Sequence, residues 1–324
     1  MKAIISTNYG GPEVLQLQEA AMPIPKKDEI RIKIYATTVS RAGTMMRTGK
    51  PYIGRLFMGF SKPTHPIPGT NFAGVVACVG KDVTLFKIGD KVFGENIDTF
   101  GTHAEFVCVS QNGVVAHLPK KMNFNEAAGI CDGALTSMNF LKNIGQLKKG
   151  QHVLINGASG SLGSSAVQLA KSMGAIVTGV CSSKNIEMVK SIGADYVIDY
   201  NQVNFSKTGL TYDLIYDTVG TRTFSNSKEA LSPNGAYISP VLGFPLLMNV
   251  LKTSISGSKK AKFSATGMLP LEVQRELFHD LIEIINKEKY HTIIDRIYPL
   301  KDVPQAHRYV DTGHKKGDVV IAVN

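Results

Sequence analysis

The first third of the chain carries short runs in which apolar and polar residues alternate. Glu29–Tyr35 has a period of two, which is typical of a strand with one buried face. Short apolar runs at Gly74–Val79 and His103–Val109 stand between glycine-containing breaks. Short strands separated by turn residues predict a compact β-barrel or sandwich in this part of the chain.

From residue 125 onwards the pattern mixes helical and strand-like runs. Asn125 is a candidate N-cap for a helix through Glu126. Apolar strand-like runs then alternate with helical ones, which predicts βαβ units, that is, a parallel sheet with helices on both faces. The predicted strands are residues 153–155, 175–180, 196–198, 214–216 and 236–238, and the predicted helices are residues 136–141, 162–173, 186–192 and 271–289. The tail from Thr292 is strand-like again.

Length and composition indicate a folded chain of about two domains. The chain has 324 residues, of which 43% are hydrophobic and 19% charged, and disorder would need fewer apolar residues and more charge. No apolar run approaches the roughly 18 residues of a membrane span, and the start lacks a secretory signal. We therefore expect no membrane partner.

The charge balance favours an anionic partner. Lys and Arg number 36 against 26 Asp and Glu, for a net charge of +10. The lysine doublets are scattered and lack the interleaved aromatic residues of a nucleic-acid reader, so we expect no nucleic-acid partner. The four cysteines, Cys78, Cys108, Cys131 and Cys181, form no CxxC pair, which favours a reducing compartment and a cytoplasmic location.

A glycine-rich turn between a predicted strand and a predicted helix carries the strongest chemical motif. Backbone N–H groups at such a helix N-terminus bind the pyrophosphate of a dinucleotide. The next predicted strand follows at the distance that a dinucleotide-binding motif requires. The alternative is that this turn only packs a helix against the sheet and binds no ligand. The candidate cofactor-binding residues are Ala158, Ser159, Gly160, Ser161, Leu162 and Gly163.

The end of the second strand favours NADP over NAD. An NAD site places an acidic residue there, about 20 residues after the loop, but the first acid is Glu187. Ser182, Ser183 and Lys184 stand there instead, and hydroxyl donors with a cation suit a 2′-phosphate. The alternative is that Lys184 is a solvated surface charge.

Six motifs cover nearly the whole chain: Tyr9–Leu15, Pro68–Val76, Gly89–Gly94, Ala158–Gly163, Gly193–Tyr200 and Gly313–Ile321. Together they resemble the zinc-free quinone-oxidoreductase branch of the medium-chain dehydrogenase/reductase superfamily. The resemblance implies an α/β protein: a GroES-like β-barrel domain (residues 1–125 and 268–324) and a Rossmann domain (residues 126–267), with the active site in the cleft between them.

The positions that match zinc ligands in related alcohol dehydrogenases lack them here. Residues 39–49 contain no Cys or His, and Thr70 stands where those relatives carry His. Zinc requires thiolate, imidazole or carboxylate ligands, and Cys131 alone does not hold a metal. We therefore expect no metal.

The resemblance also implies site residues by matching motifs. It places Thr136 near the nicotinamide ribose, Tyr200 near the adenosine phosphate and Lys184 at the 2′-phosphate. It places Val219 in a loop on the adenine side, and Val241 and Leu242 beside the nicotinamide. Many relatives have Asn-Pro-Val-Asp where this chain has residues 40–43, so their Asn amide and Asp carboxylate are absent here, whereas Ser40 still offers a hydrogen-bond donor. Tyr52 matches a substrate-side tyrosine in some relatives, or it is an ordinary loop tyrosine.

These residues predict an enzyme that transfers hydride from NADPH to a quinone or an α,β-unsaturated carbonyl. Such a small electrophilic acceptor delocalises the arriving charge, so positioning and water exclusion suffice. Solvent, Tyr52 or Ser40 supplies the proton. The alternatives are a zinc-independent alcohol or aldehyde oxidoreductase and a non-catalytic NADPH-binding protein. We expect a homodimer, and the apolar segment 244–251 lines either the acceptor pocket or a subunit contact.

Overall fold

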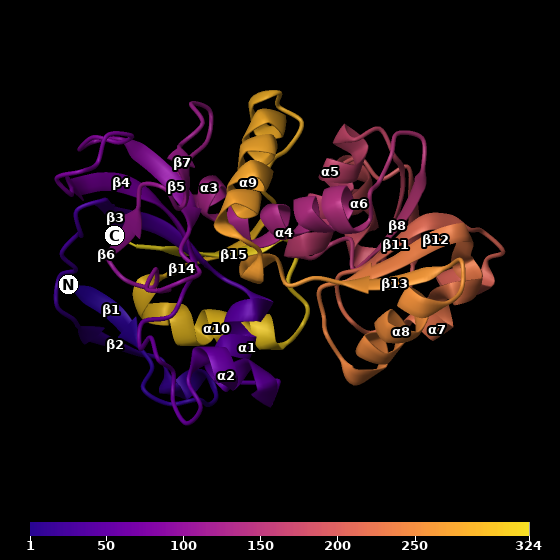
Figure 1. The fold of residues 1–324 in the computed structure, drawn as a ribbon, viewed down its shortest axis with the longest axis horizontal. Helices are drawn as coiled ribbons and strands as arrows, with labels where there is room; N and C mark the ends of the chain where they lie inside the picture. The colour runs from indigo at the N-terminus through magenta and orange to yellow at the C-terminus, as the bar shows by residue number, and fades with distance from the viewer. Residues whose placement is uncertain (324) are drawn as a thin grey trace. The chain divides into compact units, whose positions relative to one another are not determined.

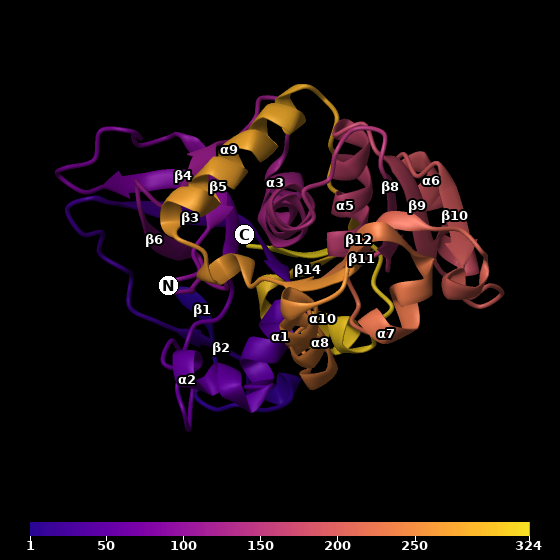
Figure 2. The same cartoon turned by 45° about the vertical axis from the view of Figure 1, so that its right-hand side comes forward.

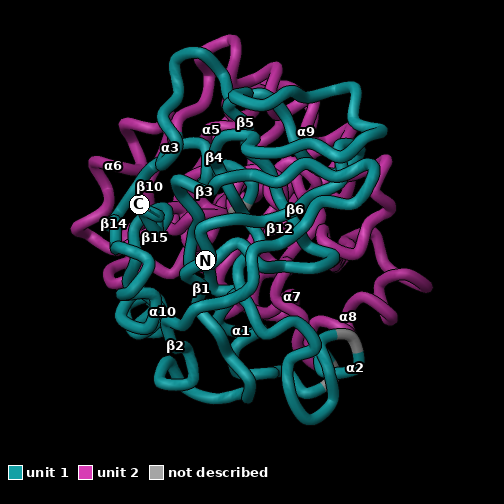
Figure 3. The backbone as a smooth tube through the Cα atoms, turned by 90° about the vertical axis from the view of Figure 1, so that its left-hand side faces the viewer, with its two compact units in different colours: residues 1–132, 292–324 teal, residues 133–291 magenta. Residues whose placement is uncertain are grey.

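The computed structural model describes residues 1–323, apart from the side chains of Ile53, Phe57 and Asp132. It divides the chain into two compact units: unit 1 contains residues 1–132 and 292–324, and unit 2 contains residues 133–291 (Figure 3). The borders expected from the sequence were 125/126 and 267/268. Helix α9 (Leu271–Asn286), which was expected in the first domain, therefore lies in unit 2.

Unit 1 is built on a seven-stranded sheet with the order β14-β15-β3-β4-β5-β7, in which β6 also pairs with β3; β1 and β2 form a separate antiparallel pair. Ile30, Ile32 and Ile34 are buried and alternate with more exposed neighbours, as the period of two predicts. The strands are β1 (Lys2–Ile5), β2 (Gln16–Glu19), β3 (Glu29–Val39), β4 (Asn71–Val79), β5 (Lys91–Glu95), β6 (Phe106–Ser110), β7 (Val114–His117), β14 (Ile294–Pro299) and β15 (Asp318–Ala322).

The helices of unit 1 are α1 (Arg41–Thr48), α2 (Arg55–Met58), α3 (Phe124–Ile130) and α10 (Val303–Asp311). The predicted N-cap of α3 is wrong, because Asn123 occupies that position and Asn125 lies inside the helix. The Asn123 side chain accepts the Glu126 N–H at 3.0 Å, and the Glu126 carboxylate accepts the Asn123 N–H at 2.9 Å. This reciprocal capping box requires the glutamate three residues after the cap, which selects Asn123.

Unit 2 contains a six-stranded parallel sheet with the order β10-β9-β8-β11-β12-β13. Helices α5 and α6 cover one face and α7 and α8 the other (Figures 1 and 2). The sequence therefore predicted the α/β fold class correctly. The strands are β8 (His152–Asn156), β9 (Ile176–Cys181), β10 (Tyr196–Asp199), β11 (Tyr212–Asp217), β12 (Leu231–Ser239) and β13 (Lys260–Phe263). The helices are α4 (Thr136–Met138), α5 (Ser161–Ser172), α6 (Ile186–Ser191), α7 (Phe224–Ser227), α8 (Phe244–Ile255) and α9.

Two segments form helical structure that the sequence did not specify. The helical path after α3 continues through residues 131–135 and 139–144 as wider π-helical turns on either side of α4. The apolar segment from Phe244 forms α8. Among the described helices, none is both long enough and apolar enough to cross a membrane.

Candidate functional site

The parallel sheet of unit 2 reverses its strand order between β8 and β11. From β8 the sheet grows through β9 to β10 in one direction, and from β11 through β12 to β13 in the other. All these strands are parallel, so their carboxyl ends share one edge. Ligands of such sheets bind outside this edge, at the point of reversal. The glycine loop follows β8 and therefore lies at this point.

Close backbone packing explains two glycines of the loop. Gly157 has a φ of +81°, and a Cβ there would collide with the Val219 side chain. A Cβ at Gly163 would collide with the Gly157 carbonyl oxygen, so this glycine lets α5 pack directly on the turn. The loop after β11 therefore lies against the glycine loop, which brings Val219 to the predicted phosphate site.

The start of α5 offers backbone donors to an anion. Gly160 is its N-cap and has no side chain that could cap the first turn of the helix. The positive end of the helix dipole lies at the same place. Ser137, next to Thr136, donates its hydroxyl to the Leu162 carbonyl oxygen at 2.9 Å, so Thr136 also lies beside this helix start.

The end of β9 is more tightly bonded than its sequence suggests. The Asn185 side-chain amide donates to the Ser159 hydroxyl at 3.0 Å and to the Ser182 hydroxyl at 3.3 Å, which ties this turn to the glycine loop. Ser183 donates its only hydroxyl proton to the Asp199 carboxylate. This bond leads the causes that hold the pKa of Asp199 below its ordinary value. Lys184 is exposed beside them.

Tyr200 follows β10 at the same edge. Its backbone N–H donates to the Cys181 carbonyl oxygen at 3.1 Å, and half of its surface (50%) is exposed. The ring is therefore open to a ligand next to Ser182 and Lys184, where the motif match places it.

Asp217 is fully buried at the end of β11 and organises the loop that follows. Its carboxylate accepts the backbone N–H groups of Val219 and Gly220 at 3.1 Å each and that of Arg222 at 3.2 Å. It also accepts the Tyr237 hydroxyl at 2.8 Å. Several donors on one carboxylate hold the loop in a single conformation.

The carboxylate and the next loop share further contacts. Asp217 accepts the Asn156 side-chain amide at 2.9 Å, so the ends of β8 and β11 are joined. A Cβ at Gly220 would lie 2.6 Å from Val241, which places that side chain against the same loop. Val241 and Leu242 are both more than one-third exposed. The edge of this sheet thus gathers the predicted cofactor-binding residues.

Unit 1 contains a cavity of about 50 Å³, here named the histidine cavity. Ser40 and Thr70, the latter standing where zinc-dependent relatives carry His, both line it. So do three histidines, His65, His103 and His307. Ser40 is the N-cap of α1, and its hydroxyl accepts the Gly43 N–H at 3.1 Å. Tyr52 is not among the lining residues described, and 66% of its surface is exposed.

Gly69 lets the His103 ring approach the cavity, and Gly43 lies within contact distance of the His307 ring. Gly69 has a φ of +92°, and a Cβ there would lie 2.5 Å from the His103 ring. A Cβ at Gly43 would lie 3.7 Å from the His307 ring and 3.8 Å from the Ser40 hydroxyl oxygen. The two rings cross at 71° with their centroids 6.2 Å apart.

Both inner histidines are neutral at physiological pH. Burial lowers the pKa of His103 from 6.5 to about 4, although its bond to the Thr38 carbonyl oxygen favours the charged form. Burial, together with His103 and the positive Arg47, lowers the pKa of His307 to about 2. A buried imidazole loses the solvation that its charged form needs.

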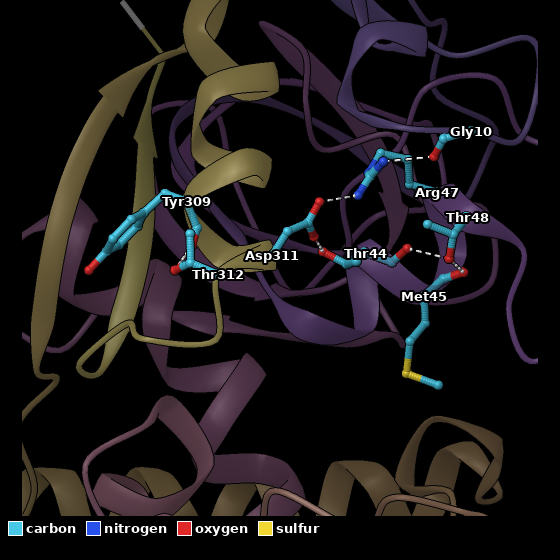
Figure 4. A network of polar contacts seen from close by, with 8 residues as sticks. All are labelled: Gly10, Thr44, Met45, Arg47, Thr48, Tyr309, Asp311 and Thr312. Atoms are coloured by element: carbon cyan, nitrogen blue, oxygen red, sulfur yellow. Dashed lines mark hydrogen bonds and ion pairs between the residues drawn. The ribbon is translucent and has the colours of Figure 1, made fainter. Parts of the chain in front are cut away.

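An ion pair between the buried Arg47 and the solvent-exposed Asp311 joins α1 to α10 beside this cavity. Figure 4 shows the Arg47 guanidinium between the Gly10 carbonyl oxygen and the Asp311 carboxylate, each at 2.7 Å. Thr44 donates its hydroxyl to the other Asp311 oxygen at 3.0 Å. Since Ser40 caps α1 and α10 carries His307, this network positions both cavity residues.

The sequence did not single out Arg47, His103 or His307 as functional residues, and it gave Asp217 no role of its own within the stretch 217–220 that the resemblance places on the adenine side. The first three are isolated in the chain, and the fold alone brings them together. Asp217 had a local signal, because an acid followed by Thr-Val-Gly ends a predicted buried strand.

Comparison with known proteins gives two family matches. Residues 26–120 match the alcohol dehydrogenase GroES-like domain, and residues 192–321 match the zinc-binding dehydrogenase family. Both cover parts of the chain that contain the motifs described above.

Individual proteins match over nearly the whole length of this chain. The chain is 32% identical to the chloroplastic quinone-oxidoreductase homolog of Spinacia oleracea, over 99% of this chain and 98% of the relative. It is 30% identical to 2-methylene-furan-3-one reductase of Solanum lycopersicum, over 99% and 79%. The crystal structure of Escherichia coli quinone oxidoreductase complexed with NADPH superposes with a TM-score of 0.84, at 25% identity and coverage of 99% and 100%.

Proposed function

Because the chain belongs to the quinone-oxidoreductase branch of the medium-chain dehydrogenase/reductase superfamily, we propose that it transfers hydride from NADPH to a quinone or an α,β-unsaturated carbonyl. The chain is an oxidoreductase of this superfamily; the cofactor and the acceptor are the parts proposed. The observation that carries the proposal is the edge of the unit 2 sheet, where the glycine loop, the Asp217 loop and Lys184 converge.

The residues of unit 2 fit a dinucleotide. The Gly160 turn and the N–H groups of α5 would bind the pyrophosphate. Lys184 and the Ser182 hydroxyl would bind the 2′-phosphate, while Ser183 stays bonded to Asp199. When bound, NADPH supplies a hydride to an electron-poor carbon. Asp217 keeps the neighbouring loop in the conformation that receives the cofactor.

The donor set does not fit zinc, although one matching family is named for it. Residues 39–49 carry no Cys or His and Thr70 stands where zinc-dependent relatives carry His, whereas zinc sites in proteins use Cys, His or carboxylate ligands. Among the described residues, no cluster of three or more His, Cys, Asp or Glu has the spacing of a metal site. We therefore assign no step to a metal.

The acceptor would instead be held by hydrogen bonds from unit 1. Ser40 accepts the Gly43 N–H and retains its own hydroxyl proton to donate. A conjugated acceptor spreads the arriving charge onto its carbonyl oxygen, where a hydroxyl donor stabilises it. The tomato relative is named for an enone and the spinach relative for a quinone, and both compounds are conjugated carbonyls.

Steady-state oxidation of NADPH tests the proposal. Purified protein is assayed with a benzoquinone, with but-3-en-2-one and with simple alcohols plus NADP. We expect turnover of the quinone, the enone or both. Turnover of the alcohols alone would favour an alcohol oxidoreductase, and NADPH binding without any turnover would favour a non-catalytic protein. Either result would overturn the proposal.

A further inference from the structure

The inner end of the histidine cavity carries polar atoms that the protein does not satisfy. His307 is 1% exposed, and among the described residues no group lies within hydrogen-bonding distance of either ring nitrogen. The same holds for Nδ1 of His103, which is 2% exposed, and Nε of Arg47, which is 5% exposed. Buried polar groups in proteins are nearly always hydrogen-bonded, so this concentration in one cavity indicates a ligand.

The protonation of these atoms follows from their neighbours. Nε2 of His103 lies 2.9 Å from the Thr38 carbonyl oxygen, which only accepts, so this nitrogen carries the proton. Nδ1 of the neutral ring is then an acceptor. His307 is neutral as well and offers one donor and one acceptor, while Nε of Arg47 is a donor. The cavity therefore presents both donors and acceptors.

The charge of the cavity favours an uncharged ligand. Arg47 is the cation nearest the histidines, and the Asp311 carboxylate at 2.7 Å compensates it. The histidines add no charge. An anion would lack a free counter-charge, and a cation would face Arg47, so either would be bound at a desolvation cost.

The size of the cavity limits the ligand to a small group. One water needs about 10–15 Å³ of such volume, so a cavity of about 50 Å³ holds roughly three to five heavy atoms. Met46, Met58 and Phe100 contribute apolar wall. The ligand group is therefore compact, with oxygen atoms at one end and carbon at the other.

We propose that the histidine cavity binds an uncharged group with a hydroxyl next to a carbonyl, as in an α-hydroxyketone, and that His307 holds it. The carbonyl oxygen accepts from the His307 ring N–H or from Arg47, and the hydroxyl donates to an unprotonated ring nitrogen. Ser40 and Thr70 line the same cavity, so this group is the polar end of the acceptor. This last step rests on the proposed function; binding does not.

Kinetics with two enones test the specificity. But-3-en-2-one and 1-hydroxybut-3-en-2-one differ by one hydroxyl next to the carbonyl. One added hydrogen bond of about 1.4 kcal/mol corresponds to a tenfold preference in kcat/KM for the hydroxyketone. We expect His307→Leu to reduce this ratio to about one and His307→Gln, which keeps a donor and an acceptor, to restore part of it. An equal ratio in the wild type and His307→Leu would overturn the assignment.

Binding of hydroxyacetone separates the site from the reaction, because this ketone has no conjugated double bond. The ring nitrogen resonances of ¹⁵N-histidine-labelled protein should shift saturably at His307 and His103 at millimolar hydroxyacetone. Exposed His279 serves as the control. Shifts at the cavity without turnover of either the enone or the quinone would refute the proposed function and keep the site. Enone turnover without such shifts would refute the site and keep the function.

Discussion

The proposed preference for NADPH depends most on one residue, Lys184. It is exposed next to Ser182, whereas Ser183 already donates to Asp199. We expect Lys184→Ala to raise the KM for NADPH about tenfold, since a charge-assisted contact contributes about 1.5–3 kcal/mol and exposure weakens it. The KM for NADH should change less than about twofold, because NADH carries no 2′-phosphate. Initial rates with both cofactors measure this.

Lys190→Ala is the matched control for that substitution. Lys190 is an exposed lysine of α6 and pairs with Glu187 at 3.4 Å. Its removal changes the net charge equally and should leave both KM values unchanged. An equal effect of the two substitutions would show that the general positive charge attracts NADPH and that Lys184 makes no specific contact.

The buried histidines make stability depend on pH. In the unfolded chain they bind protons below their ordinary pKa of 6.5, but in the folded protein only below about 4 for His103 and about 2 for His307. The stabilisation that comes from burying the two neutral histidines is therefore complete above pH 6.5 and is lost as the pH falls. When the pH is lowered from 7 to 5, the free energy of unfolding of the wild type should fall by about 2 kcal/mol more than that of His307→Leu. Urea denaturation at both pH values measures the two losses, and equal losses would mean that His307 is not buried in its neutral form.

The sequence could not reveal this cavity. His103 lies in a strand-like run, and His307 lies in the tail, which was predicted to be strand-like although it contains α10. Neither local pattern marks a cavity. Only the pairing of distant segments places the two rings 6.2 Å apart. Ser40 was accessible to sequence reasoning because a motif match marked its position.

At the level of elements, the loop after β11 depends on Asp217. Asp217→Asn replaces one acceptor oxygen with an NH₂ group that faces backbone donors. We expect a loss of about 2–4 kcal/mol in the free energy of unfolding and a rise of about tenfold in the Kd for NADPH. Urea denaturation and a binding titration measure the two effects.

Asp213→Asn separates a local effect from general destabilisation. Asp213 lies at the other end of β11, where its carboxylate accepts the His152 N–H at 2.9 Å and the Ser232 hydroxyl at 2.8 Å. This substitution should destabilise the same strand and leave the Kd for NADPH unchanged. If it weakens NADPH binding as much as Asp217→Asn, the role of Asp217 is structural only.

Element boundaries were predicted less well than the elements. Two asparagines, Asn123 and Asn125, stand in the segment before Glu126, and only the reciprocal bonds show which one caps α3. The π-helical turns at 131–135 and 139–144 have no distinct sequence pattern, because their apolar residues are consistent with an ordinary helix. In contrast, strands β8, β9 and β11 were found because each is a short apolar run that ends at a turn.

For the whole molecule, the change of pattern near residue 125 was enough to predict two domain types. Period-two runs mark the half-buried sheet of unit 1, and fully apolar runs mark the parallel sheet of unit 2, whose strands are covered on both faces. The exact border between the two units could not be predicted from the sequence, because α9 has the amphipathic pattern of any surface helix.

The sequence also predicts a homodimer, and α8 offers apolar surface for a subunit contact. Phe244, Leu247, Leu251 and Ile255 are spaced along this helix and are 43–88% exposed. Apolar surface of this kind marks contact sites in soluble proteins. Sedimentation equilibrium should give a mass of about twice 35.1 kDa. A mass of 35.1 kDa at all concentrations would contradict the prediction.

Transfer of a labelled hydride tests the central claim most directly. The protein is incubated with NADPH that carries deuterium on the transferred position of nicotinamide C4, and with but-3-en-2-one as the acceptor. The account predicts butan-2-one with one deuterium on the carbon that was the β-carbon of the enone, while the proton on the α-carbon comes from solvent. Butan-2-one without deuterium, or deuterium on the carbonyl carbon of an alcohol product, would contradict it.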